Sequence, residues 1–340
     1  MRKIYQTALL IILKVFQVLA TGVKTTEKVF VRRGDDIVLN CTCFRENNGE
    51  WKGPNISSLS NHSKEEFLIP YATGLKLNPI LEGSNVRVVG GYDSNTCKLV
   101  INNFLAMNEG IYRCHYVQSN TEFNHVFKVV VIYPPDLKLY MYNLSDGIKL
   151  TCNASGKPST YIFEDWEHRS EFNEKIRYLK GTHDGNLFIQ YDQYQNSGRY
   201  TCNVTNGVSS RNGNLFQTRQ ISIPYEGTPM FVFGNDRTQF GQYGNEIKVA
   251  FNIFSSTEIG VTIIETNMIH TFEDLVRPCN STCQGYLEFH GVNITILCTR
   301  FLFSFLISGT EDFTNYTVEV CNKHGCINRV VGIERYLTLT

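Results

Sequence analysis

The chain has 340 residues, with 32 basic and 32 acidic side chains and a formal net charge of zero. This length is too great for one domain of roughly 100 residues and suits about three. No run of lysine or arginine is long enough to indicate nucleic acid or an anionic membrane surface as a partner.

The first segment, residues 1–22, has the order of a secretory signal peptide. Arg2 and Lys3 charge its start, an apolar stretch covers residues 8–13, and the small residue Gly22 suits a cleavage site. A membrane span needs about 20 apolar residues, and neither this stretch nor any later one reaches that length. We therefore expect a secreted chain without a direct membrane span or a lipid-anchor signal.

The cysteines and asparagines agree with an extracellular location. Eleven cysteines behind a signal peptide predict disulfides in an oxidising compartment. N-glycosylation sequons, Asn-x-Ser/Thr, are frequent, as expected of an extracellular surface. They begin at Asn40, Asn55, Asn61, Asn143, Asn153, Asn203, Asn280, Asn293 and Asn315.

Residues 23–133 contain the first copy of a repeated frame. A cysteine, Cys41, is followed by Trp51, and a Gly-x-Tyr-x-Cys segment ends the frame at Cys114. Apolar residues alternate with polar ones before Cys41 and again near Leu99, which predicts two strands with one buried face. This pattern predicts a first β-domain.

Residues 134–226 contain the second copy of the frame. Its members are Cys152, Trp166 and a Gly-x-Tyr-x-Cys segment that ends at Cys202. Pro134 and Pro135 mark the boundary before it, because proline cannot donate to a strand ladder. We expect these prolines to end the first sheet and to stiffen the joint.

Residues 227–340 keep the strand pattern but not the frame. Ile247, Val249 and Phe251 alternate as a strand would, yet Phe251 stands near the place of the first cysteine, and no tryptophan occurs after Trp166. Residues 315–326 have the pattern of a hairpin. The segment predicts a third, divergent sandwich.

The two complete frames resemble the immunoglobulin superfamily, with its multi-domain adhesion and immune-recognition proteins. The resemblance implies an all-β chain of tandem immunoglobulin-like sandwiches. The first would be variable-like, the second a compact I- or C2-type, and the third immunoglobulin-like or fibronectin-III-like. It also implies that disulfides Cys41–Cys114 and Cys152–Cys202 join opposite sheets beneath a tryptophan, while the tyrosine two residues before the second cysteine bonds back to the backbone.

Four more cysteines are predicted to pair within the end domains. Cys43 shares a strand face with Cys41, and Cys97 opens the neighbouring strand, so a disulfide between Cys43 and Cys97 is geometrically reasonable. Cys321 and Cys326 flank a hairpin turn and could bridge across it.

The last three cysteines leave the pairing open. Cys279 and Cys283 could close a small loop, which would leave Cys298 as a buried free thiol or, less favoured, as an intermolecular bridge. A zinc site made of Cys279, Cys283 and the two hairpin cysteines is a weaker hypothesis in a secreted chain.

The tripeptide Arg33-Gly34-Asp35 spells an integrin-binding motif. The favoured interpretation is a turn into the next strand, in which glycine supplies an unusual φ and aspartate caps the turn.

No enzyme motif is evident, because the histidines are scattered and neither a Gly-x-Ser-x-Gly elbow nor a phosphate loop occurs. We therefore expect a non-catalytic chain without a cofactor or a bound metal. The resemblance implies a protein ligand, bound by the G-F-C-C′ face and F–G loop of the first domain. Carried over to this sequence, that face would also include His115, Val117, Ser119 and Glu122. The residues expected to contact the ligand are Gln118, Asn120 and Phe123. Phe123 could instead turn into the core.

Two functional hypotheses follow. The favoured one is a secreted recognition module, such as a soluble receptor, a decoy or an immune factor, that binds an extracellular protein. The alternative is an adhesion or matrix component that acts by self-association, a class that includes truncated forms of anchored receptors.

Overall fold

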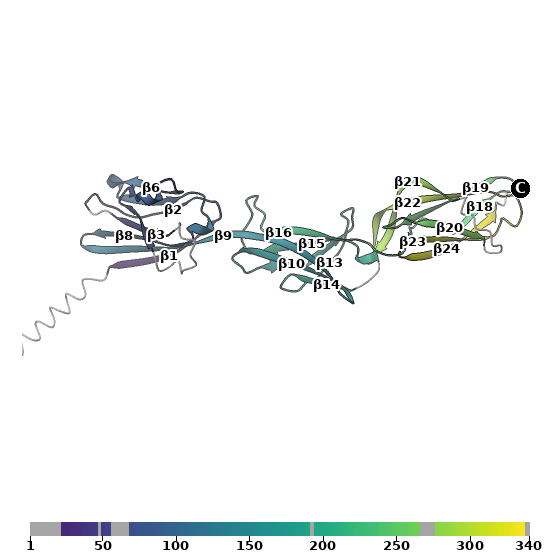
Figure 1. Ribbon diagram of the computed structural model, residues 1–340, viewed down its shortest axis with the longest axis horizontal. Coiled ribbons are helices and arrows are strands. Elements are labelled where there is room, and N and C mark those ends of the chain that lie inside the picture. Colours follow the sequence, from purple (N-terminus) through teal and green to yellow (C-terminus); the bar gives the residue numbers. More distant parts are fainter. Residues whose placement is uncertain (1–21, 47–48, 56–67, 191–193, 266–275, 337–340) are drawn as a thin grey trace, which may run out of the picture. The chain divides into compact units, whose positions relative to one another are not determined.

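The computed structural model describes residues 22–46, 49–55, 68–190, 194–265 and 276–336, and within residues 262–281 it describes the backbone alone. In these ranges the regular structure consists of β-strands and short 3-10 helices (Figure 1). The all-β fold class is confirmed. The predicted signal peptide and Asn61 lie outside the described residues, as do the side chains of Cys279 and Asn280.

Two sheets form the first sandwich. One contains β1 (Val23–Arg32), β9 (Thr121–Asn143), β8 (Gly110–Gln118), β3 (Glu50–Pro54), β4 (Leu68–Thr73) and β5 (Lys76–Leu77) in that order. The other contains β2 (Ile37–Leu39), β7 (Thr96–Ile101) and β6 (Val86–Gly91). The extra strands β4 and β5 beside β3 are those of a variable-type sandwich.

The core of the first sandwich is built around its disulfide. The Cα atoms of Cys41 and Cys114 are 6.0 Å apart, and Trp51 beside them is completely buried. The indole Nε1 of Trp51 donates to the carbonyl of Cys97 at 2.9 Å. The hydroxyl of Tyr112 donates to the carbonyl of Asn108 at 2.5 Å. A second disulfide joins Cys43 and Cys97.

The prolines of the first boundary follow the last residues of β9 that pair with β8 and β1, but they do not end the strand itself. Pro134 and Pro135 lie inside β9, whose backbone stays extended from Thr121 to Asn143. The pairing of β9 with β8 ends at Val129, and that with β1 ends at Ile132. Extended backbone is the conformation that proline favours, so the prolines limit the ladder and not the strand.

Two compact units divide the chain. The first is Met1–Pro135 with Gly156–Thr160 and Asn206–Leu215, and the second is the remainder. The predicted domain boundaries at residues 22, 133 and 226 stay predictions, although each of the three sandwiches has its own cluster of buried apolar side chains.

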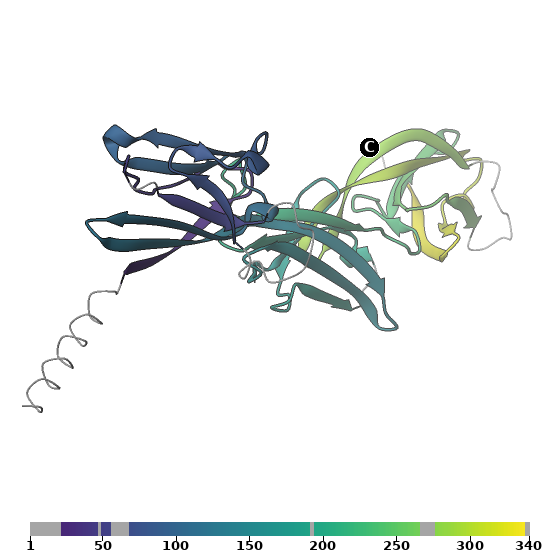
Figure 2. The same cartoon turned by 60° about the vertical axis from the view of Figure 1, so that its left-hand side comes forward.

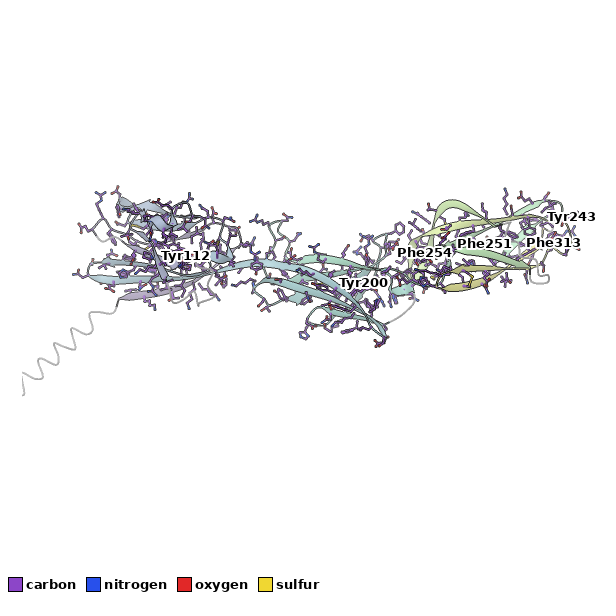
Figure 3. The ribbon with its side chains drawn as sticks, viewed as in Figure 1. Tyr112, Tyr200, Tyr243, Phe251, Phe254 and Phe313 are labelled. Carbon is purple, nitrogen blue, oxygen red and sulfur yellow. A yellow bond between two sulfur atoms is a disulfide. The ribbon has the colours of Figure 1, made fainter. Side chains whose placement is uncertain are left out.

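The second sandwich repeats the core of the first. β10 (Gly147–Lys157) lies between β9 and β14 (Asn186–Gln190). The facing sheet contains β11 (Ile162–Phe163), β12 (Trp166–Arg169), β13 (Lys175–Leu179), β15 (Gly198–Thr205) and β16 (Gln217–Ile223). Cys152 and Cys202 are bonded, and Trp166 is 1% exposed. The hydroxyl of Tyr200 donates to the carbonyl of Asn196 at 2.9 Å. Tyr200 and its counterpart in the first domain, Tyr112, are labelled in Figure 3.

The third sandwich has two four-stranded sheets (Figure 2). The first contains β17 (Met230–Phe231), β19 (Glu246–Phe254), β22 (Val292–Leu306) and β21 (Val276–Phe289). The second contains β18 (Thr238–Gly241), β24 (Gly325–Arg335), β23 (Asn315–Asn322) and β20 (Gly260–Glu265). β18 pairs in parallel with β24, as β1 pairs with β9 in the first sandwich.

The third sandwich keeps the tyrosine hydrogen bond of the frame without its cysteines. The hydroxyl of Tyr316 donates to the carbonyl of Asp312, four residues earlier, at 3.1 Å. Two residues after Tyr316, where the other domains have a cysteine, stands Val318, which is 1% exposed. Val318 and Phe251 belong to one buried cluster, so apolar packing stands where the other domains have a disulfide between sheets.

The disulfides of the third sandwich correct one prediction. Cys283 is bonded to Cys298, its register partner across β21 and β22, so the expected free thiol at Cys298 is wrong. Cys321 and Cys326 are bonded across the hairpin of β23 and β24. Three of the four sulfur atoms in the zinc hypothesis are therefore in disulfides. Both of these disulfides join neighbouring strands of one sheet.

Candidate binding face of the first domain

The hairpin of β8 and β9 presents the most exposed part of the predicted binding face. Ser119 and Asn120 form its turn with φ values of 48° and 60°. Positive φ at both central residues is the geometry of a type I′ turn, which matches the twist of the strands. Residues 118–122 are all exposed, so Gln118 and Asn120 lie at the solvent-facing tip.

Phe123 lies on the core side of this hairpin and not on the outer face. It is the register partner of Tyr116, and their rings stack with centroids 4.9 Å apart and planes 6° apart. Tyr116 is 7% exposed, and Phe123 packs against the same buried cluster. Of the two predicted orientations of Phe123, the structure has the inward one. Its ring packs between the tip of the hairpin and the buried cluster of the first domain.

The outer face beside the tip carries polar and charged side chains that lie close together. His115 Nε2 lies 3.9 Å from Glu122 Oε2 across β8 and β9. On the neighbouring strand β3, Lys52 Nζ lies 3.0 Å from Glu50 Oε2. A partly exposed ion pair such as Lys52–Glu50 contributes only about 0–1 kcal/mol to stability, so its charges are available to a ligand at little cost.

The sequons lie elsewhere on the described surface. Asn40 is exposed next to β2, in the opposite sheet, and Asn55 is half-buried directly after β3. In the other two sandwiches, Asn203 is half-buried, and the exposed sequon asparagines are Asn143, Asn153, Asn293 and Asn315. Neither β1 nor residues 110–129, which form the paired part of the hairpin of β8 and β9, contain a sequon asparagine. N-glycans at these asparagines would leave the hairpin tip uncovered.

The Arg33-Gly34-Asp35 tripeptide forms the turn between β1 and β2. Gly34 has φ of 89°, which a residue with a side chain rarely adopts. The Arg33 guanidinium lies over the Tyr133 ring, 3.6 Å from its centroid. Because this contact holds the arginine against its own domain, the geometry favours the turn interpretation.

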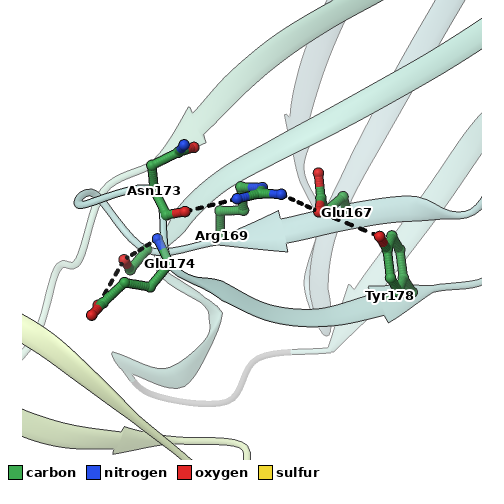
Figure 4. Close-up of polar contacts among 6 residues, drawn as sticks. Glu167, Arg169, Asn173, Glu174 and Tyr178 are labelled. Atoms are coloured by element: carbon green, nitrogen blue, oxygen red, sulfur yellow. Dashed lines mark hydrogen bonds and ion pairs between the residues drawn. The ribbon is translucent and has the colours of Figure 1, made fainter.

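The second domain holds a polar cluster that the sequence did not reveal. Arg169 donates to Glu167 at 2.6 Å and to the carbonyl of Asn173 at 2.8 Å, and Glu167 also accepts from Tyr178 (Figure 4). The hydrogen bond from Arg169 is the main cause of the lowered pKa of Glu167. Charge pairs at neighbouring strand positions are a common surface feature and indicate no ligand.

Next to this cluster lies a buried histidine. His168 is completely buried, its ring stacks on Tyr200 with centroids 4.3 Å apart, and its Nε2 lies 2.8 Å from the carbonyl of Ser197. Burial lowers the pKa of His168 to about 4. The neutral ring therefore serves packing. Neither it nor the cluster around Glu167 was among the predicted site residues, because single polar residues in strands carry no sequence signal.

The comparisons with known proteins come from sequence and from structure. No protein-family model matches the chain. The chain is 27% identical to Protein turtle homolog A of Mus musculus over 108 residues. The matched segment covers 29% of this chain and 9% of that protein. The match thus spans less than a tenth of the relative's length.

Solved structures resemble much more of the chain. One chain of "Crystal structure of Dpr2 Ig1-Ig2 in complex with DIP-Theta Ig1-Ig3" has a TM-score of 0.53 and 14% sequence identity, and the match covers 91% of this chain and 97% of that one. The I-band fragment I67-I69 of titin has a TM-score of 0.45 and 14% identity, over 93% of this chain and 97% of that one. The first similarity establishes the fold. The protein is a chain of tandem immunoglobulin-like sandwiches.

In the described part of the chain, no helix is long and apolar enough to cross a membrane.

Proposed function

We propose that the chain is an extracellular, non-catalytic recognition protein that binds another protein through the hairpin tip of its first domain. The observation that carries this proposal is a fully exposed tip, Gln118 to Glu122, on a rigid support. The stacked rings of Tyr116 and Phe123 and the Cys41–Cys114 disulfide hold that support in place. Binding residues of immunoglobulin-like domains commonly lie on loops that a rigid sandwich positions.

Two further observations support a protein ligand. The Dpr2–DIP-Theta structure with the same fold is itself a complex between immunoglobulin-domain proteins. The bonded cysteine pairs fit an oxidising compartment, as does the predicted signal peptide. Secretion after cleavage near Gly22 and glycosylation of exposed sequons are parts of this proposal.

The tip is tested with variants of the full secreted chain against a panel of extracellular ectodomains. Gln118→Ala and Asn120→Asp should each weaken binding of the captured ectodomain, because both side chains lie at the exposed tip. The Asp substitution tolerates the positive φ at position 120, so the turn is kept.

Asn95→Asp is the matched control, because Asn95 is also exposed, has φ of 51°, and lies beside the opposite sheet. It should bind as the unmodified chain does. Equal losses for Asn95→Asp and Asn120→Asp, or no loss at either tip position, would contradict the placement. Sedimentation at high concentration tests the alternative function, adhesion by self-association. Self-association through this face predicts a dimer, and a monomer at high concentration would count against it.

A further inference from the structure

The parallel pairing of β1 with β9 brings together basic residues that are far apart in the sequence. Each residue of β1 pairs with the residue one hundred positions later, so Lys28 lies beside Lys128. Val29 and Val31 pack against the core, and side chains alternate along a strand, so the even-numbered residues of both strands face outward. Lys24, Lys28 and Arg32 therefore share the outer face with Lys128.

These cations form a line along the strand. Successive members of Lys24, Lys28 and Arg32 are four residues apart, which is about 13 Å on an extended strand. Lys128 stands next to Lys28 at the middle of the line, on a strand about 5 Å away. Arg113, on the outer face of β8, is the register partner of Val126 in β9 and adds a fifth positive charge. All but the half-buried Arg113 are exposed.

Within the residues that the structure describes, none of the five makes an ion pair. The other even-numbered positions between the ends of the line are uncharged. Thr26 and Phe30 are exposed, Asn124 and Val130 are half-buried, and Val126 is buried. Beyond that stretch, Glu122 lies near His115. Glu27 is on the opposite face of its strand by the same alternation. In a chain of zero net charge, this is a local concentration of positive charge.

We propose that this basic strip, defined by Lys24, Lys28, Arg32, Arg113 and Lys128, binds a linear sulfated polysaccharide of the glycosaminoglycan class. A line of unpaired cations fits a chain that carries sulfate and carboxylate groups at intervals along its length. Arginine and lysine hold such groups by charge-assisted hydrogen bonds. The strip has no sequon, so no N-glycan is attached to it.

A globular acidic protein is the other possible partner, and the strip suits it less well. Protein interfaces are anchored by aromatic side chains that fill pockets. One aromatic side chain, Phe30, lies beside the strip; it is 57% exposed, and the ammonium of Lys28 lies 4.9 Å from its ring centroid. The strip thus offers charge along a line, with one aromatic ring that already contacts a lysine of the strip.

The test uses the full secreted chain and immobilised heparin in surface plasmon resonance at several NaCl concentrations. The logarithm of the affinity should fall linearly with the logarithm of salt, with a slope of about −4 for five cationic contacts. Lys28→Ser combined with Lys128→Ser should reduce that slope by about 2 and weaken binding about tenfold at physiological salt.

The control removes the same charge from the opposite side of the domain. Arg45→Ser with Arg87→Ser takes two exposed arginines from the region of β2 and β6, and should leave heparin binding unchanged. Circular dichroism checks that both double variants fold. Equal losses in the two double variants, or no retention of the unmodified chain on heparin at physiological salt, would refute the strip. Binding to polyglutamate but not to heparin would refute it in favour of an acidic protein.

Discussion

Lowering the pH from 7.5 to 5.0 should weaken the second domain, because unfolding lets His168 take up a proton that the folded domain resists. The ring is completely buried, and its Nε2 donates to the carbonyl of Ser197. Its Nδ1 is buried without a partner, so a proton there would be a buried unpaired charge. Burial is the largest cause of the lowered pKa, and the facing Arg177 and His290 also favour the neutral ring.

The sign and size follow from linkage. The pKa of His168 falls from 6.5 to about 4 on folding. The unfolded chain therefore binds more protons between these values, and stability is present above pH 6.5 and is lost as the pH falls toward 4. Each tenfold change in proton affinity is about 1.4 kcal/mol, so the full loss is about 3 kcal/mol, with about 2 kcal/mol lost by pH 5.0.

The assay follows urea unfolding by fluorine NMR of 5-fluorotryptophan. The chain has two tryptophans, so Trp51 reports on the first domain and Trp166 on the second. The urea midpoint at Trp166 should fall at pH 5.0. The variant His168→Gln, which can still donate to Ser197, should lose most of that pH dependence. Equal pH dependence at Trp166 in the variant and the unmodified chain would refute the reasoning.

Three further predictions concern the cores. Phe251→Ala should cost the third domain about 3–5 kcal/mol, because it removes a buried ring from the core cluster and leaves a cavity. Hydrogen exchange of β19 and β22 measures this loss, and protection unchanged from the unmodified chain would contradict it. Tyr316→Phe should cost about 1 kcal/mol, read from the same exchange data, and a loss near zero would mean that its hydrogen bond to Asp312 adds nothing. Replacing both Cys41 and Cys114 by serine should cost the first domain about 2–5 kcal/mol and reduce the secreted yield, which an immunoblot of the medium measures. An undiminished yield with unchanged stability would contradict the expected role of this disulfide.

The sequence predicted those parts of the fold that depend on local pattern. The spacing of cysteine, tryptophan and Gly-x-Tyr-x-Cys indicated two sandwiches, and the alternation through Ile247, Val249 and Phe251 indicated β19, because both signals are read along one strand. The tyrosine bond of the third domain could have been found too. Tyr316 and Val318 have the spacing of tyrosine and cysteine in the other frames.

Features that depend on pairing between distant strands were missed. Cys279 and Cys283 are close in sequence, and that proximity alone suggested a small loop between them. The register of β21 with β22 places Cys283 against Cys298 instead. The basic strip was invisible for the same reason, because its residues never form a run and only the pairing of β1 with β9 aligns them.

The placement of the disulfides also sets how each domain can lengthen under a pulling force. In the first two domains the bonded cysteines are 73 and 50 residues apart, so the enclosed chain cannot extend even when the sandwich comes apart. In the third domain the described loops enclose separations of only 15 and 5 residues. Most of its length is free to unravel once its apolar contacts between sheets are lost. Under tension the third domain is therefore the most extensible of the three, and the first two domains lengthen only by the residues outside their disulfide loops.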